Sequence, residues 1–217
     1  MVNDIRKFID LVKNYKPIIK ENYNFTGKTI MCVDIQSEYE SGITFDIGTW
    51  VEFINDSYRS NRIVFLYNGE ETLGMISEYD YKYWLMEHGI SEDVIDGAVF
   101  YDKGYAFFRY CIDNSIDDDS IVDLVKFMIT NDINDSRDFD EDMWNKFIDE
   151  TNVGNNEVKE LLEYAGDMIN IPDLMDFLKN YSNIVLMGGG INECLKEVEI
   201  ALNALDKNYE TVNQFIY

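Results

Sequence analysis

Three short segments of the sequence carry side chains that could act chemically on a small molecule. Asp34 follows an apolar run, and a carboxylate in that place can act as a base, orient a ligand or hold a metal. Lys103 follows another apolar run, and a lysine drawn inward there can stabilise an anion. Cys194 follows three glycines, and a thiolate is a strong nucleophile. Taken singly, each residue also fits an ordinary turn, surface or core position.

The glycines before Cys194 are typical of a turn between a strand and a helix. Glycine lets the backbone adopt left-handed conformations and lets a ligand approach closely. Backbone N–H groups at a helix start can hold an oxyanion, so Gly189 and Gly190 are the expected backbone part of a site. The helix dipole favours a thiolate in the first turn, which predicts a lowered pKa for Cys194.

Strands and helices are predicted to alternate along the chain. Continuous apolar runs predict buried strands, and apolar residues at three- and four-residue steps predict helices. We expect strands at 29–33, 62–67, 98–101, 184–187 and 209–217, and helices at 5–15, 45–54, 77–88 and 192–205. Such alternation favours an α/β fold, a parallel sheet with helices on both faces.

The candidate residues are expected to meet at one edge of this sheet. Ligands of parallel sheets bind beyond the carboxyl ends of the strands. Asp34, Asn68, Lys103 and Gly188 each fall at such an end. We therefore predict that Asp34, Lys103 and Cys194 converge there.

Residues 112–180 differ from the rest of the chain. They contain 19 acids and 5 bases, and they show only helical patterns. Apolar residues at helical spacing interrupt the acids, which predicts an acidic helical insertion packed on the sheet. The α/β core would then consist of residues 1–111 and 181–217. The cluster at 138–142 could bind a basic protein partner, although acidic surfaces usually serve solubility.

Composition excludes several classes of protein and of site. The chain has 217 residues, of which 46% are hydrophobic, so it can bury a core as one domain with an insertion. Its net charge of −24 argues against direct nucleic-acid binding and against an electrostatic hold on a membrane. His88 is the single histidine, and Cys32, Cys111 and Cys194 form no CxxC pair, so we expect no metal and no cofactor. Without a signal peptide or an apolar span, a cytoplasmic protein is expected, and a homo-oligomer stays open.

Four segments together resemble the isochorismatase-like superfamily of cysteine hydrolases. Residues 34–39 (DIQSEY) resemble the family's D-x-Q-N-D-F motif, and residues 103–107 (KGYAF) resemble K-x-x-Y-S-A-F with two residues fewer. Residues 188–194 (GGGINEC) resemble G-V-x-T-x-x-C, with Ile191 in place of threonine. The following helix, 194–209, is similar to the family's C-V-x-x-T-A-x-x-A-x-x-L-G-Y, with Val198 and Glu199 in place of Thr-Ala.

This resemblance implies a Rossmann-like, isochorismatase-like fold and a hydrolase that cleaves an amide-type C–N bond. Asp34 would take the thiol proton of Cys194, and Lys103 would balance the charge as an acyl-enzyme forms. The backbone N–H groups of the glycine turn would hold the oxyanion. The peptide bond between Gly189 and Gly190 would have an unusual conformation, and one form of the hypothesis makes it cis. The expected substrate-binding residues are Gln36, Asn68 and Tyr105.

Two other classes of function fit the same sequence. One is a non-catalytic acidic interaction protein or nucleic-acid mimic, which the net charge favours. The other is a magnesium-dependent nuclease with Asp34, Glu38 and Asp102 around the ion. A reactive Cys194 would distinguish the hydrolase from both.

Overall fold

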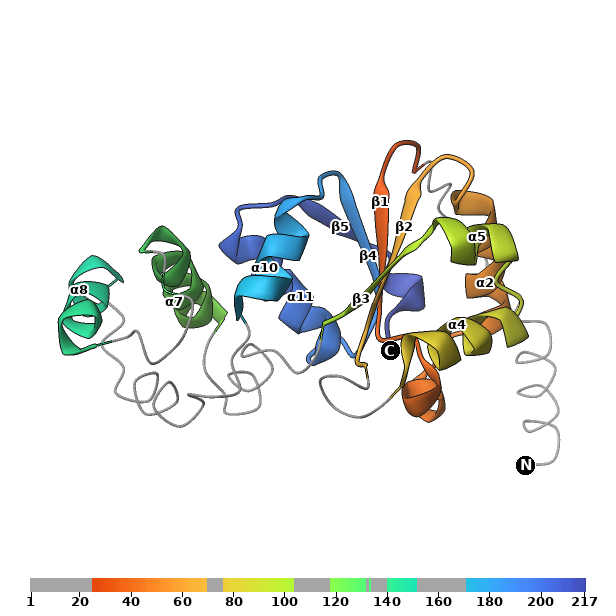
Figure 1. Ribbon diagram of the computed structural model, residues 1–217, viewed down its shortest axis with the longest axis horizontal. Helices are drawn as coiled ribbons and strands as arrows, with labels where there is room; N and C mark the ends of the chain where they lie inside the picture. Colours follow the sequence, from red (N-terminus) through yellow and green to blue (C-terminus); the bar gives the residue numbers. More distant parts are fainter. Residues whose placement is uncertain (1–24, 70–75, 104–117, 132, 134–139, 152–170) are drawn as a thin grey trace, which may run out of the picture.

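A five-stranded parallel sheet forms the centre of the protein (Figure 1). The computed structural model describes residues 25–69, 76–103, 118–131, 133, 140–151 and 171–217. The strands lie in the order β3-β2-β1-β4-β5, and every neighbouring pair is parallel. Their bounds are β1 Thr29–Val33, β2 Arg62–Tyr67, β3 Val99–Asp102, β4 Ile184–Gly188 and β5 Tyr209–Thr211. The predicted α/β class with a parallel sheet is therefore confirmed.

The strand order reverses between β1 and β4. The chain runs outward from β1 through β2 to β3, and then returns to place β4 and β5 on the other side of β1. Val33 pairs with Leu66 of β2 and with Gly188 of β4, so these three strands end at the same level. In such sheets the point of reversal is where ligands bind, beyond the carboxyl ends. Asp34 and the glycine turn lie at this point.

Three helices cover one face of the sheet (Figure 1). They are α2 (Ile47–Ser57), α4 (Glu78–Glu87) and α5 (Glu92–Gly97). Asp46 caps α2 by accepting the Thr49 N–H, and Ser77 caps α4 by accepting the Asp80 N–H. Gly89 follows α4 at a φ of 101°, which is the conformation expected of a helix stop. The short helix α5 was not predicted.

On the opposite side of the sheet lie α10 (Ile171–Lys179) and α11 (Cys194–Ala204), and outside them α7 (Asp118–Thr130) packs on α11 and α8 (Glu141–Thr151) packs on α7 (Figure 1). Alternating residues of the central strands face the two sides, so Met31 and Val33 join this cluster whereas Ile30 and Cys32 join the other. Buried residues of α7, α8 and α10 belong to the same apolar cluster as Met31 and Val33. In the described part of 112–180, α10 and α7 pack on α11, and α8 packs on α7, so α7 and α8 form a layer outside α11. The predicted acidic insertion stays a prediction.

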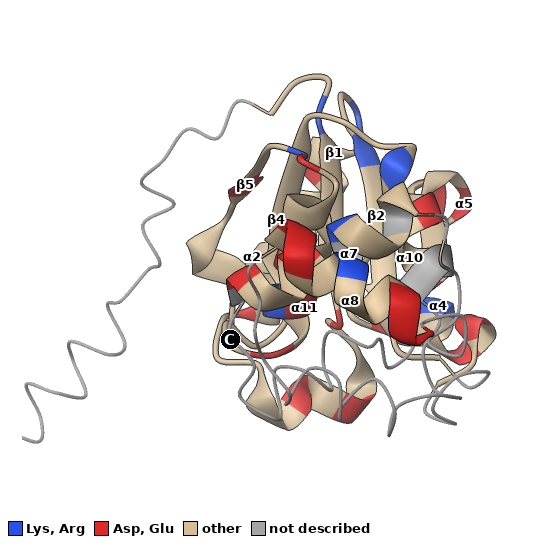
Figure 2. Cartoon of the chain, turned by 90° about the vertical axis from the view of Figure 1, so that its left-hand side faces the viewer, with Lys and Arg blue, Asp and Glu red and all other residues tan. Residues whose placement is uncertain are grey.

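Acidic side chains remain on the outside of these helices. Asp140, Glu141 and Asp142 are exposed at the start of α8, and Asp149 and Glu150 are exposed near its end. Figure 2, which faces α7 and α8, shows Asp and Glu on several helices of this side. Asp138 of the predicted cluster lies outside the described residues. No helix in the described ranges is both long and apolar enough to cross a bilayer.

Two predicted elements differ from the structure or fall outside it. The strand expected at 209–217 stops at Thr211, and a 3-10 helix follows at Asn213–Phe215. This turn buries Phe215 against Phe45 and Phe53, which an extended chain would not do. The helix predicted at 5–15 lies outside the described residues.

Candidate active site

Asp34 is the first residue after β1, and it is completely buried. Its backbone has a φ of 48°, in the left-handed region that a non-glycine residue seldom adopts. The Asp34 N–H donates to the Leu66 carbonyl, and the Tyr217 hydroxyl donates to the Asp34 carbonyl. These bonds on both sides of the residue fix a strained backbone, and strain of this kind is common at functional sites.

Lys103 brings a buried positive charge to Asp34 from the end of β3. Its Nζ lies 3.0 Å from Asp34 Oδ2, and only 2% of its side chain is exposed. The same Nζ donates to Asn68 Oδ1 at 3.1 Å and to Glu197 Oε2 at 2.7 Å. An ammonium has three N–H donors, so these three acceptors use all of them. The two carboxylates raise the pKa of Lys103 despite its burial, and it stays charged.

Asn68 and Gln36 lock the ends of β1 and β2 together. The Asn68 N–H donates to Gln36 Oε1 at 2.9 Å, and Gln36 Nε2 donates to the Asn68 carbonyl. Asn68 Nδ2 also donates to Asp34 Oδ2 and to the Tyr39 hydroxyl. Both side chains are buried. Of the expected substrate-binding residues, Gln36 and Asn68 thus position the site, and Tyr105 lies outside the described residues.

Cys194 is the first residue of α11, and its side chain is half-buried. Its thiol lies close enough to the Asp34 carboxylate and to the Lys103 ammonium for both charges to change its pKa. The predicted convergence of Asp34, Lys103 and Cys194 is therefore found. Because Asp34 and Lys103 are buried, the thiol is the group of the three that a small molecule can approach.

The predicted lowering of the Cys194 pKa is wrong. Burial raises the pKa of this thiol to about 12, and the neighbouring Asp34 carboxylate adds to the rise. The positive charge of Lys103 opposes the rise but is outweighed. At rest the site therefore holds a protonated thiol beside an acceptor, and a base is needed to generate the nucleophile.

The glycine turn has little space for side chains. Gly188 and Gly189 have φ values of 80° and 69°. A Cβ on Gly188 would lie 2.4 Å from the Val33 carbonyl oxygen, and one on Gly189 would lie 2.7 Å from the Leu195 nitrogen. The Gly190 carbonyl accepts from Glu193 and Leu195, while its N–H donates to no other described residue. The described chain contains no cis peptide, so the bond between Gly189 and Gly190 is trans.

Replacing Gly189 with alanine is expected to lower the free energy of unfolding more than the same change at Gly27. Both residues have a similar positive φ, but a Cβ on Gly27 would meet nothing within 4 Å. Gly27→Ala should cost about 1–2 kcal/mol for the conformation alone. Gly189→Ala should cost a further ~1–3 kcal/mol for the clash with Leu195. Urea unfolding measures both, and equal losses would contradict the tight packing at the turn.

Glu197 is a member of this cluster that the sequence reasoning missed. It lies on α11 one turn after Cys194, and only 1% of its side chain is exposed. Its carboxylate makes the shortest contact to Lys103. The available signal was an acid three residues after a candidate nucleophile, which places both side chains on the same face of the predicted helix.

Two tyrosines border the site. Tyr39 comes from the 3-10 helix η1 (Ser37–Gly42), and Tyr217 follows the last turn of the described chain. Burial raises the pKa of both hydroxyls, and the charges of Asp34 and Cys194 contribute to each shift. These two phenols therefore remain neutral hydrogen-bonding groups beside the thiol.

The residues proposed for a magnesium site do not come together. Asp34 contacts Lys103, Glu38 accepts from Gln36 and Ser37, and Asp102 accepts the Gly69 N–H. Among the described residues, no three His, Cys, Asp or Glu side chains are grouped so that they could hold a metal ion. The described residues therefore do not favour the nuclease hypothesis.

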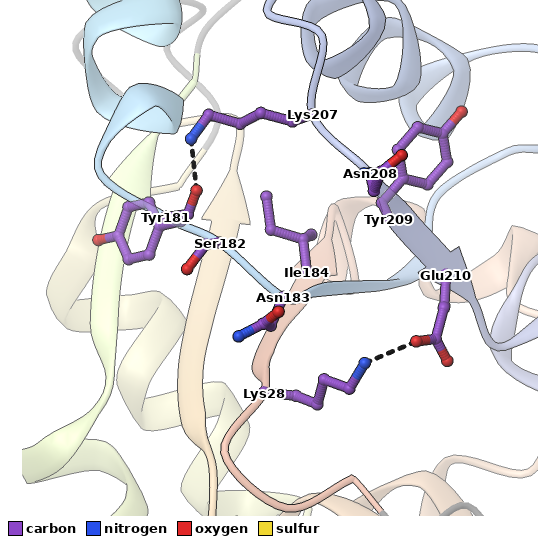
Figure 3. Close-up of a pocket in the computed structure, with 9 residues that line it drawn as sticks. All are labelled: Lys28, Tyr181, Ser182, Asn183, Ile184, Lys207, Asn208, Tyr209 and Glu210. Carbon is purple, nitrogen blue, oxygen red and sulfur yellow. Dashed lines mark hydrogen bonds and ion pairs between the residues drawn. The ribbon is translucent and has the colours of Figure 1, made fainter.

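A separate pocket of about 260 Å³ lies at the opposite, amino-terminal edge of the sheet (Figure 3). Its two lysines already have partners. Lys28 pairs with Glu210, and Lys207 donates to the carbonyls of Lys179 and Tyr181. The pocket lacks a nucleophile and a base in the arrangement found at the other edge, so it is not the candidate active site.

The cluster of Asp34, Lys103, Cys194 and Glu197 is thus the candidate active site by its geometry. Comparisons with models of protein families, with curated proteins and with solved structures give no match for this chain.

Proposed function

We propose that this protein is a small-molecule hydrolase that cleaves an amide-type C–N bond with Cys194 as its nucleophile. The observation that carries the proposal is a half-buried thiol beside a buried carboxylate, which is itself paired with a buried lysine. The arrangement lies where the strand order reverses, which is the usual ligand site of parallel sheets. A Rossmann-like fold of the isochorismatase-like type, suggested by the resemblance of the motifs, belongs to the same proposal.

The first half of the reaction forms a thioester. As Cys194 Sγ bonds to the substrate carbonyl carbon, the thiol proton moves to Asp34. The Gly190 N–H donates to the oxyanion that develops. The C–N bond then breaks, and Asp34 returns the proton to the leaving nitrogen. The Asp34 carboxyl group thus acts first as the general base and then as the general acid.

The second half regenerates the enzyme. Water attacks the thioester carbon, Asp34 accepts a proton from that water, and the C–S bond breaks. The proton returns to Sγ as the carboxylic acid leaves. Lys103 transfers no proton in this scheme, because its three donors are bound to protein acceptors. Its charge keeps Asp34 in place and offsets the negative charge of the transition state.

Turnover of simple amides tests this proposal. Purified protein is incubated with a panel of small primary amides and p-nitroanilides, and the release of ammonia or p-nitroaniline is followed. For any substrate that turns over, Cys194→Ser should lower the rate by about 10³-fold or more, because the alkoxide is far harder to generate. The control Cys32→Ala removes a buried thiol on β1 and should leave the rate within a few-fold. Equal turnover by Cys194→Ser and the wild type would refute the proposal.

The alternative role as an acidic interaction protein is favoured by one observation, the exposed acids of α8. That role does not need the buried charges around Cys194. Burying ions costs several kcal/mol each unless they are paired, so a cluster of this kind is unusual for a protein that only presents surface charge.

A further inference from the structure

We propose that Glu197 is a positioning residue of this site, which fixes the Lys103 ammonium and gives the resting site an excess of negative charge. The inference deepens the proposed hydrolase function, on which its kinetic meaning rests. Its geometric basis is independent of any reaction.

The first support is the way in which Lys103 is held. Glu197 Oε2 lies 2.7 Å from Lys103 Nζ, whereas Asp34 Oδ2 lies at 3.0 Å and Asn68 Oδ1 at 3.1 Å. Glu197 is the acceptor that α11 contributes, and Asp34 and Asn68 come from the ends of β1 and β2. Lys103 therefore joins the helix that carries the nucleophile to the strands that carry the base.

The second support is the balance of charge around the thiol. Among the described residues, the titratable groups whose charges interact with that of Cys194 include Asp34 after β1, Tyr39 of η1, Lys103 after β3, Glu197 of α11 and Tyr217. Within the described residues, the two acids of this set oppose a single ammonium, and the phenols are neutral. If Asp34 and Lys103 were alone, their charges would cancel. Glu197 supplies the surplus negative charge, and a thiolate would add another in a buried place.

This surplus has a consequence for the chemistry. An ionised Cys194 at rest would be exposed to alkylating agents and oxidants. With Glu197 ionised, the thiol keeps its proton, and Asp34 removes it only as the bond to the substrate forms. Glu197 acts by holding the Lys103 ammonium and by the electrostatic effect of its negative charge on the thiol. It does not need to touch the substrate.

The pH dependence of Cys194 alkylation tests the role of Glu197 without any substrate. Wild-type protein and Glu197→Gln are treated with iodoacetamide between pH 6 and 11, and the rate of modification of the Cys194 peptide is quantified by mass spectrometry. The wild-type midpoint is expected above this range, so it is obtained from the rising part of the curve, where the rate is proportional to the thiolate fraction. Glu197→Gln keeps an oxygen that can accept from Lys103 but loses the charge. The midpoint for Cys194 should fall by about one pH unit or more, which makes alkylation at pH 7 about tenfold faster.

Two further variants make the outcome decisive. Glu193→Gln removes the same charge from an exposed residue adjacent to Cys194, and screening by water should leave the midpoint close to that of the wild type. Glu197→Met also removes the charge but introduces no amide group, and it should shift the midpoint as Glu197→Gln does. If one of the two variants fails to fold, the other still tests the proposal. A loss of stability without a shift of the midpoint would assign Glu197 a purely structural role and overturn the proposal. A wild-type midpoint at the ordinary thiol value would overturn it as well.

These results separate the two proposals. Amide turnover that survives Cys194→Ser would refute the hydrolase while leaving a shifted alkylation midpoint intact. An unshifted midpoint in a protein that needs Cys194 for turnover would refute only the role of Glu197.

Discussion

Replacing Lys103 with methionine is expected to lower the free energy of unfolding by about 3–5 kcal/mol at pH 7. The change keeps most of the apolar stem but leaves Asp34 and Glu197 as buried carboxylates without a counter-ion. Removing one partner of a buried ion pair is costly because the remaining charge stays out of water. Urea unfolding at pH 7 measures the loss.

The raised pKa of Lys103 explains why the unfolding of Lys103→Met is measured at pH 7. A lysine whose pKa is higher in the folded state contributes its full stabilisation below the unfolded value, about 10.4. The contribution is lost as the pH rises through the folded pKa. At pH 7 the whole stabilisation is therefore present.

A matched control uses a surface pair. Lys179 lies 2.7 Å from Asp176, and both side chains are largely exposed. Lys179→Met should cost no more than about 1 kcal/mol, as surface pairs generally do. If Lys103→Met cost as little as this control, the buried charge network would not exist in solution.

Replacing Asp34 with asparagine is expected to slow steady-state hydrolysis by about 10²–10⁴-fold. The amide keeps the shape of the side chain, and Lys103 retains Glu197 as its counter-ion. What is lost is the group that takes the proton from the Cys194 thiol and, later, from the attacking water. With p-nitrophenyl acetate, whose leaving group needs no proton, formation and hydrolysis of the Cys194 thioester should therefore both be slowed. Nitrophenolate release should be slow from the start, without the rapid first turnover that a free thiolate would give.

An exposed carboxylate outside the buried cluster supplies the control for this experiment. Asp46 caps α2 and has no contact with Lys103 among the interactions described, and asparagine is an equally good cap. Asp46→Asn should behave as the wild type does. Rapid steady-state release by Asp34→Asn would show that another group activates water.

The strands were predictable because buried strands have a recognisable sequence pattern. β1, β2 and β4 are covered on both faces, so nearly all their residues are apolar, and each run ends at a polar residue or glycine. Parallel pairing then brings those ends to one edge. This is why Asp34, Lys103 and Cys194 could be expected to meet from strand ends alone.

The remaining features depend on contacts between distant parts of the chain. Glu197 reads as a solvated helix residue until Lys103, 94 positions away, is known to lie against it. The thiol pKa of Cys194 was predicted in the wrong direction because the helix dipole can be inferred from sequence, whereas burial cannot. The short β5 follows from packing of Phe215 onto Phe45 and Phe53, which local patterns do not specify.

The most direct test of the central claim, that Cys194 is the nucleophile and Asp34 its base, is the position of the acyl group. Protein treated with p-nitrophenyl acetate is digested, and the acetylated peptide is identified by mass spectrometry. Our account predicts an acetyl thioester on Cys194 that forms and turns over in the wild type and forms far more slowly in Asp34→Asn. Acetylation confined to lysines, or a Cys194 that stays unmodified in both proteins, would contradict it.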